Sequence, residues 1–259
     1  MTRVARSWIN DSLEGLGSIT ILLIEVVKSV FTRRLVWRDL LYQIYFIGVK
    51  SQSVVLITGA FTGMVLCAQT FFQFHKVKMD TATGAVVSVS MGSELGPVLT
   101  ALMVAGRVGA AMAAELGTMR VTEQIDALRT LASHPVDYLI VPRMLATLLA
   151  LPLLTAESIA LGIAASYALG VYLLGIDPGY YWHNMIHYTG PEDMLTGFIK
   201  AAVFGLIIAL IGCYKGLHCG QGAEGVGRAT TEAVVFSSIS ILITNFFLTL
   251  VLNEVLQPT

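Results

Sequence analysis

Five long apolar stretches dominate the hydropathy pattern of the chain. They run over residues 44–72, 83–112, 138–176, 194–215 and 233–256. A helix needs about 20 residues to cross the hydrocarbon core of a bilayer, and each stretch is long enough. Lipid offers the backbone no hydrogen-bond partners, so apolar stretches of this length form helices. Because the alternation typical of a membrane β-barrel is missing, the pattern predicts an all-α membrane protein.

The third stretch allows two arrangements. It is long enough to cross once and extend well beyond the lipid, or to hold a hairpin that crosses twice. Inner loops of membrane proteins are enriched in Lys and Arg. A second crossing would place residues 177–193, which contain neither, on the inner side. We therefore expect one crossing here and five in total.

Basic residues also orient the chain in the membrane. Six lie before the first stretch: Arg3, Arg6, Lys28, Arg33, Arg34 and Arg38. The connection 113–143 adds three arginines, whereas the tail after residue 254 has no basic residue. The positive-inside rule then predicts an N-terminus on the inner side and a C-terminus on the outer side.

Residues 1–40 are expected to form an N-terminal region distinct from the membrane domain, residues 41–259. Apolar side chains between Ile19 and Phe31 recur on one helical face, opposite Glu25 and Lys28. This pattern predicts an amphipathic helix in the inner membrane interface. Acidic residues interrupt the region and no convincing cleavage site follows, so we expect no signal peptide.

The composition agrees with a lipid-embedded chain. Hydrophobic residues make up 55% and charged residues 13%, and the mean hydropathy is +0.74. The low charge content leaves too few groups to cover a soluble surface. A net charge of -1 provides no basic footprint, so nucleic acid is not expected as a partner.

Charges inside the apolar stretches are the first candidates for function. A charged side chain at the bilayer centre costs about 3 kcal/mol on insertion scales, so it usually faces a cavity, a partner or a pathway. Glu94, Glu157 and Lys200 are such residues. Glu94 also lies between two glycines and before Pro97, which removes a backbone donor. A carboxylate beside a helix irregularity indicates a site or a hinge.

The connection after the second stretch predicts a short amphipathic helix at about residues 122–131. Thr122 is a possible cap, Glu123 and Asp126 lie in the first turns, and Arg129 lies near the end, an order that suits the helix dipole. Two interpretations stay open: a helix resting on lipid, or a helix that docks into a groove of a soluble partner.

Short motifs that resemble nucleotide or metal sites lack the neighbouring residues or elements that such sites require. Gly220-x-Gly222-x-x-Gly225 lies between two membrane stretches and not in a βαβ unit. His183 and His187 have Asn184 where a zinc protease has Glu, so an aromatic interface belt is the better interpretation. His218 with two cysteines lacks a fourth ligand. No GxxxxGK[ST] or GxSxG occurs, so we expect no catalytic residue, no metal and no cofactor in this chain.

Residues 92–128, GSELGPVLTALMVAGRVGAAMAAELGTMRVTEQIDAL, resemble the signature of the MlaE/YrbE family of ABC-transporter permeases. The similarity continues through HPVDYLIVPR (134–143), LPLLT (151–155) and GVGRATTEAVVFSS (225–238). It therefore covers most of the chain from about residue 40.

The resemblance implies a multi-pass permease of the bacterial inner membrane that moves phospholipid between the inner and outer membranes. Its N-terminus would be cytoplasmic and its C-terminus periplasmic. The implied partners are a second copy of the chain, a cytoplasmic ABC ATPase that binds the ATP, a hexameric MCE-domain protein and often a STAS-domain protein. The family fold has an N-terminal interfacial helix followed by five transmembrane helices.

The resemblance also assigns residues. The family's coupling helix matches residues 122–131, so Thr122, Glu123, Gln124, Asp126 and Arg129 are implied to couple to the ATPase. Arg107 and Arg120 are candidates for anchoring this inner surface.

In the membrane, Lys200 matches the family's lysine in the fourth span, and Glu94, Lys200 and Asn245 are implied at the lipid cavity. Two positions depart from the enterobacterial pattern: Ser93 replaces an arginine and Asn245 replaces an acidic residue.

Two other classes of function compete with this assignment. An ion-coupled secondary transporter would use Glu94 and Glu157 as proton sites, but five spans do not divide into equal repeats. A lipid-modifying membrane enzyme would need a nucleophile with a base, or a metal set, and the sequence offers neither.

Overall fold

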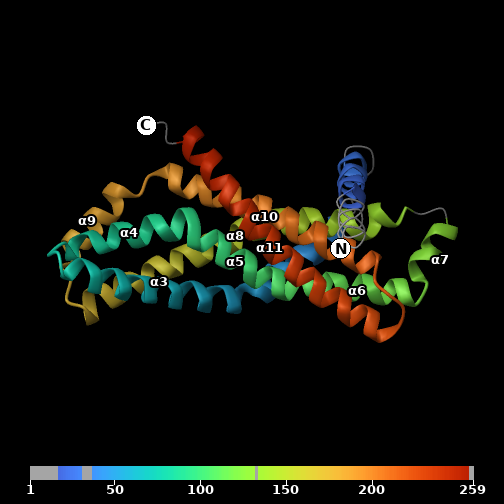
Figure 1. Ribbon diagram of the computed structural model, residues 1–259, viewed down its shortest axis with the longest axis horizontal. Coiled ribbons are helices and arrows are strands. Elements are labelled where there is room, and N and C mark those ends of the chain that lie inside the picture. Colours follow the sequence, from blue (N-terminus) through green and yellow to red (C-terminus); the bar gives the residue numbers. More distant parts are fainter. Residues whose placement is uncertain (1–16, 31–36, 132–133, 257–259) are drawn as a thin grey trace, which may run out of the picture.

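The computed structural model describes residues 17–30, 37–131 and 134–256. Every regular element within these residues is helical, and no strand occurs among them. The long helices run roughly alongside one another and form an elongated bundle (Figure 1). The predicted all-α membrane fold is therefore confirmed.

Five helical segments are long and apolar enough to span a membrane, one for each predicted stretch. The first three are interrupted by short one-turn or π-helical segments (η). The first span consists of α2 (Trp37–Ile47), η1 (Val49–Ser51) and α3 (Gln52–His75). The second consists of η2 (Asp80–Ala82), α4 (Thr83–Ser90), η3 (Met91–Leu95), α5 (Gly96–Val104), η4 (Ala105–Gly109) and α6 (Ala110–Val121). The third consists of η5 (Val136–Ile140), α8 (Val141–Ala168) and η6 (Leu169–Leu173). The last two spans are single helices, α10 (Pro191–Leu217) and α11 (Gly222–Leu256).

The third segment is helical without a break from Val136 to Leu173. This confirms a single crossing and excludes the hairpin. Pro152 lies inside α8 and does not end it.

Two shorter helices, α7 (Gln124–Thr130) and α9 (Pro178–Tyr188), lie at opposite ends of the bundle (Figure 1). The helix α9 was not predicted, because its aromatic residues were interpreted only as an interface belt. Asp177 caps it by accepting a hydrogen bond from the backbone N–H of Tyr180. Tyr181 is fully buried and its hydroxyl lies 3.1 Å from Ser166 Oγ, and burial raises the pKa of Tyr181 above its usual range.

Residues 17–30 form the expected N-terminal helix, which runs across the long axis of the bundle (Figure 1). Leu22 and Val26 are buried in the main core, whereas Ile21, Ile24 and Val27 remain exposed. The sequence predicted an apolar face toward lipid, so the packing of the Leu22 and Val26 side chains on the bundle is a contact that it did not predict. Phe31 lies outside the described residues, and the location of this helix in the membrane interface stays a prediction.

Small residues allow the long helices to approach closely. A Cβ on Gly63 of α3 would collide with the backbone of Gly162 of α8, and one on Gly59 would collide with Ser158. Close backbone approach of this kind stabilises helix pairs in lipid, where the hydrophobic effect does not drive association. The Gly59-x-x-x-Gly63 motif therefore fixes the contact between the first and third spans.

Replacing Gly63 with Ala tests this contact. We expect the free energy of unfolding in detergent micelles to fall by about 1–3 kcal/mol, because the added methyl group must push α3 and α8 apart. The control is Gly106→Ala in η4, where a Cβ would meet no atom within 4 Å. Equal stability of the two variants would contradict the assigned role.

Candidate functional site

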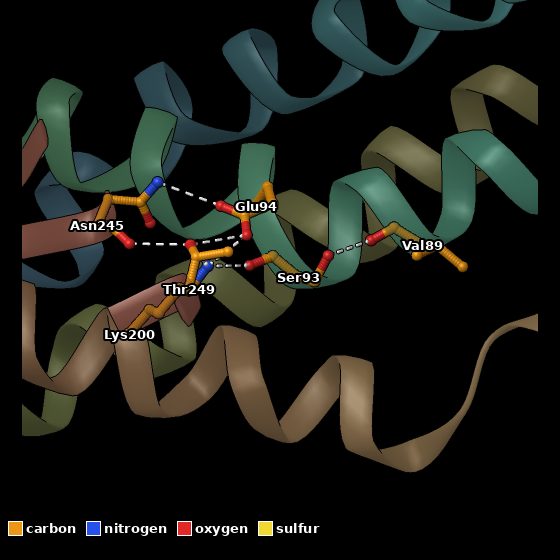
Figure 2. A network of polar contacts seen from close by, with 6 residues as sticks. All are labelled: Val89, Ser93, Glu94, Lys200, Asn245 and Thr249. Carbon is orange, nitrogen blue, oxygen red and sulfur yellow. Dashed lines mark hydrogen bonds and ion pairs between the residues drawn. The ribbon is translucent and has the colours of Figure 1, made fainter. Parts of the chain in front are cut away.

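A buried ion pair inside the bundle is the main polar feature of the spans. Lys200 of α10 has no exposed surface, and its Nζ lies 2.6 Å from Glu94 Oε1 in the second span. The ammonium also donates to the carbonyl oxygen of Ser93 at 3.1 Å and to Thr249 Oγ1 at 2.8 Å. Figure 2 shows these side chains pointing toward one another from three different spans.

The backbone of the second span provides a hydrogen-bond acceptor for the Lys200 ammonium. Glu94 lies in η3, a π-helical turn, and Pro97 follows it at the start of α5. Proline has no N–H, so it cannot donate to the carbonyl of Ser93 four residues earlier, and this oxygen accepts from Lys200 instead. The helix α10 reaches η3 because Gly197, one turn before Lys200, lies against the backbone of Gly92.

The helix α11 completes the network with two side chains. Asn245 Nδ2 donates to Glu94 Oε2 at 3.1 Å, and Thr249 Oγ1 lies 3.0 Å from Glu94 Oε1 (Figure 2). The structure thus brings together Glu94, Lys200 and Asn245, the three residues predicted at one cavity. Thr249 was missed, although its position four residues after Asn245 places it on the same helix face.

The charges of Lys200 and Glu94 balance each other, but the two side chains differ in how much of their surface is exposed. Taking an ammonium out of water is costly unless a counter-charge and hydrogen bonds replace the lost solvation, and the network supplies both to Lys200. The Glu94 side chain keeps 36% of its surface exposed. Glu94 is therefore the charged member of the pair that a ligand can reach.

Glu157, the second carboxylate of the ion-coupled alternative, lies in a different contact. Its Oε1 accepts a hydrogen bond of 3.0 Å from Gln52 Nε2 at the start of α3. In the described part of the chain, no hydrogen bond or ion pair joins Glu157 to the Glu94 network. The structure therefore shows no relay between Glu94 and Glu157.

The helix predicted at residues 122–131 is present as α7, but its start differs from the prediction. Thr122 does not cap it: Thr122 Oγ1 donates to the carbonyl of Thr118 at 2.8 Å and so belongs to the end of α6. Glu123 follows with a φ of 60°, in the left-handed region. This residue turns the chain between α6 and α7. The capping prediction failed because a Thr hydroxyl near a helix end can equally bond back to the carbonyl four residues earlier.

Some polar side chains at α7 form ion pairs within the chain, whereas others are exposed. Asp126 accepts from Arg120 Nη1 at 3.0 Å and from Arg129 Nη1 at 3.2 Å. This cluster joins α7 to α6, assisted by the buried side chain of Ile125. Glu123 and Gln124 are exposed. Of the five residues expected to couple to a partner, these two are exposed and form no side-chain hydrogen bond or ion pair with another described residue.

Arg107 and Arg143 each link two neighbouring spans. Arg107 Nη1 donates to Ser51 Oγ at 2.6 Å, linking η4 to η1. Arg143 of α8 is buried and lies 2.9 Å from Glu115 Oε2 of α6. In the sequence, Arg143 counted only as a basic residue for the orientation of the chain in the membrane. Its partner Glu115 was not predicted.

A metal centre finds no support in the geometry. Among the residues that the structure describes, no three or more His, Cys, Asp and Glu side chains gather to hold an ion. The imidazole rings of His183 and His187 stack on α9 with their centroids 5.8 Å apart.

Comparison with known proteins identifies the family. A profile of the family described as Permease MlaE matches residues 40–251. A probable ABC transporter permease protein of Rickettsia felis is 44% identical over 91% of each chain. The intermembrane phospholipid transport system permease protein MlaE of Haemophilus influenzae is 37% identical over 82% of each chain. The chloroplastic protein TRIGALACTOSYLDIACYLGLYCEROL 1 of Arabidopsis thaliana is 40% identical over 89% of this chain and 66% of that protein.

The chain belongs to the MlaE permease family. It is a multi-pass membrane protein, and its relatives named ABC transporter permeases imply an ATPase partner. Within this MlaE permease, the side chains of Ser93 and Asn245 carry no formal charge. Both lie at the Lys200–Glu94 pair, so the network of this permease has one formal positive and one formal negative charge.

A double-mutant cycle tests the buried pair. We expect Glu94→Gln to destabilise the permease more than Glu94→Gln combined with Lys200→Met, because the single change leaves a buried ammonium without its counter-charge. The coupling free energy from unfolding in micelles should be about 1–3 kcal/mol.

The matched control is the exposed pair of Arg120 and Asp126, whose side chains are 40% and 49% exposed. The cycle of Arg120→Gln and Asp126→Asn should give a coupling of at most about 1 kcal/mol. A coupling at Lys200 and Glu94 no larger than this would contradict the importance of the buried pair.

Proposed function

We propose that this chain is the membrane permease subunit of an ABC transporter that moves phospholipid between the inner and outer membranes. The observation that carries the proposal is the Lys200–Glu94–Asn245 network: a small polar site within apolar spans, reachable at Glu94. A phospholipid requires apolar walls for its acyl chains and a few polar groups for its headgroup. Family membership and the intermembrane phospholipid transport role named for the Haemophilus influenzae relative support the same substrate.

Two copies of the chain are proposed to form the working unit. The helix α11 carries a row of exposed large apolar side chains, among them Leu242, Phe246 and Leu250. An apolar helix face in lipid can contact acyl chains or a second copy, and the network at Asn245 and Thr249 lies on this same helix. A homodimer would therefore enclose the two Glu94 sites in one cavity between the copies.

The proposed orientation places the N-terminus in the cytoplasm and the C-terminus in the periplasm, within the inner membrane. It follows from the basic residues at the end of the bundle that carries α7. On the cytoplasmic side the permease would bind the ABC ATPase, which holds the ATP, with a STAS-domain protein as a further partner. On the periplasmic side, near α9, it would meet a hexameric MCE-domain protein. The permease itself would need no cofactor.

One continuous helical segment links the two functional regions. The second span runs from Asp80 to Val121, holds Glu94 in η3 and ends at the turn into α7. A displacement of α7 by the ATPase would therefore reach Glu94 along a single element. ATP binding can drive the permease only if the partner contacts α7 differently in the two states, and the exposed Glu123 and Gln124 are placed for that contact.

Glu123→Lys tests the coupling. We expect the purified permease–ATPase complex to lose the stimulation of its ATPase activity by phospholipid, falling to about the unstimulated rate, because a rim charge of the wrong sign repels the partner. Lys meets the same steric constraint as Glu in the left-handed conformation of residue 123, so the change reports charge. Reversal at Asp126 would be less informative, since it breaks the internal pair with Arg120.

The control is Glu254→Lys, an exposed carboxylate near the other end of the bundle. It should leave the lipid stimulation intact. Stimulation that survives Glu123→Lys, in a complex that still assembles and inserts, would show that α7 is not the coupling element.

A further inference from the structure

The hydrogen-bond inventory of Lys200 shows that its ammonium is not free for a ligand. An ammonium has three N–H donors, and Lys200 directs them to Ser93 O, Glu94 Oε1 and Thr249 Oγ1. The side chain is also completely buried. Lys200 therefore serves as the internal counter-charge of Glu94, and a lipid phosphate would have to break this pair to bind it.

Two oxygens at the network can accept a further hydrogen bond. Among the described residues, Glu94 Oε2 accepts one hydrogen bond, from Asn245 Nδ2, and a carboxylate oxygen can accept two. Asn245 Oδ1 is buried and has no hydrogen-bond partner among the described residues. Rotating this amide would turn its oxygen toward the Glu94 carboxylate, so the orientation with Oδ1 away from Glu94 is favoured.

The pair consequently forms a dipole with its positive end buried and its negative end toward the accessible side. We propose that this site selects phospholipids whose headgroup carries a primary ammonium, such as phosphatidylethanolamine, over anionic headgroups such as phosphatidylglycerol. The ammonium donates to Glu94 Oε2, the acceptor at the exposed member of the pair. This inference rests on the proposed function and names the substrate class of its site.

Ser93 supports this assignment because its side chain is uncharged. Its hydroxyl donates to the carbonyl of Val89 at 2.8 Å, within its own helix, and so adds no positive charge beside Glu94. Charge-assisted hydrogen bonds are about twice as strong as neutral ones. A cation at residue 93 would compete with the lipid ammonium for Glu94 and would attract phosphate.

The test uses the full permease–ATPase complex in nanodiscs of dioleoyl phosphatidylethanolamine and dioleoyl phosphatidylglycerol in equal amounts. The complex is re-isolated in detergent, and the retained lipids are counted by mass spectrometry. We expect retained phosphatidylethanolamine to exceed phosphatidylglycerol by about tenfold, the ratio that 1.4 kcal/mol of differential binding gives. Equal retention, or an excess of phosphatidylglycerol, would overturn the proposal.

Three variants assign the preference to the network. Glu94→Gln with Lys200→Met removes both charges together and should bring the ratio close to one. Ser93→Arg should reverse it in favour of phosphatidylglycerol, and Glu254→Gln, which removes an exposed carboxylate elsewhere on α11, should leave it unchanged. A ratio that stays the same in the first two variants would place the selectivity outside this site.

The failure of this inference can be separated from failure of the proposed function. Retention of both lipids without preference, with ATPase activity still stimulated by phospholipid, refutes only the headgroup selection. A complex that retains no phospholipid and shows no lipid stimulation refutes the proposed function itself.

Discussion

The requirement to solvate one buried ammonium organises the centre of this permease. Lipid provides no water for Lys200, so the chain must supply its acceptors. They come from η3 and from α11, while Lys200 itself comes from α10. Three spans are thereby held in one relative arrangement. The irregularities of the second span, a π-helical turn and a proline, follow from the same requirement, since they free a carbonyl for the ammonium.

The second span has a double role because of where its ends lie. One end turns at Glu123 into α7, which Asp126 and Arg120 fasten to α6. Its middle holds Glu94. Arg143 and Arg107 connect the same span to α8 and to η1. Under the proposed function, a displacement of α7 by the ATPase would reach Glu94 along this span, while the ion pairs hold the α7 end to the neighbouring helices.

Much of this organisation follows from the sequence, and the rest depends on contacts between distant residues. Hydropathy predicted the five apolar stretches, the distribution of basic residues predicted the single third crossing, and the charges at Glu94 and Lys200 marked the site. Thr249 and the Arg143–Glu115 pair were missed because their roles depend on partners more than 25 residues away in sequence. The Thr122 cap failed because the choice between two local hydrogen bonds depends on the turn at Glu123. The helix α9 was not predicted because its aromatic residues were interpreted only as an interface belt.

We propose that this permease provides a path for lipid and that a separate ATPase subunit drives the movement. The most direct measurement reconstitutes the permease into liposomes with a fluorescent phospholipid, either alone or with its ATPase subunit. We expect ATP-dependent lipid movement only when the ATPase is present, and none from the permease alone under a pH gradient. Lipid movement by the permease alone, driven by the gradient, would contradict it.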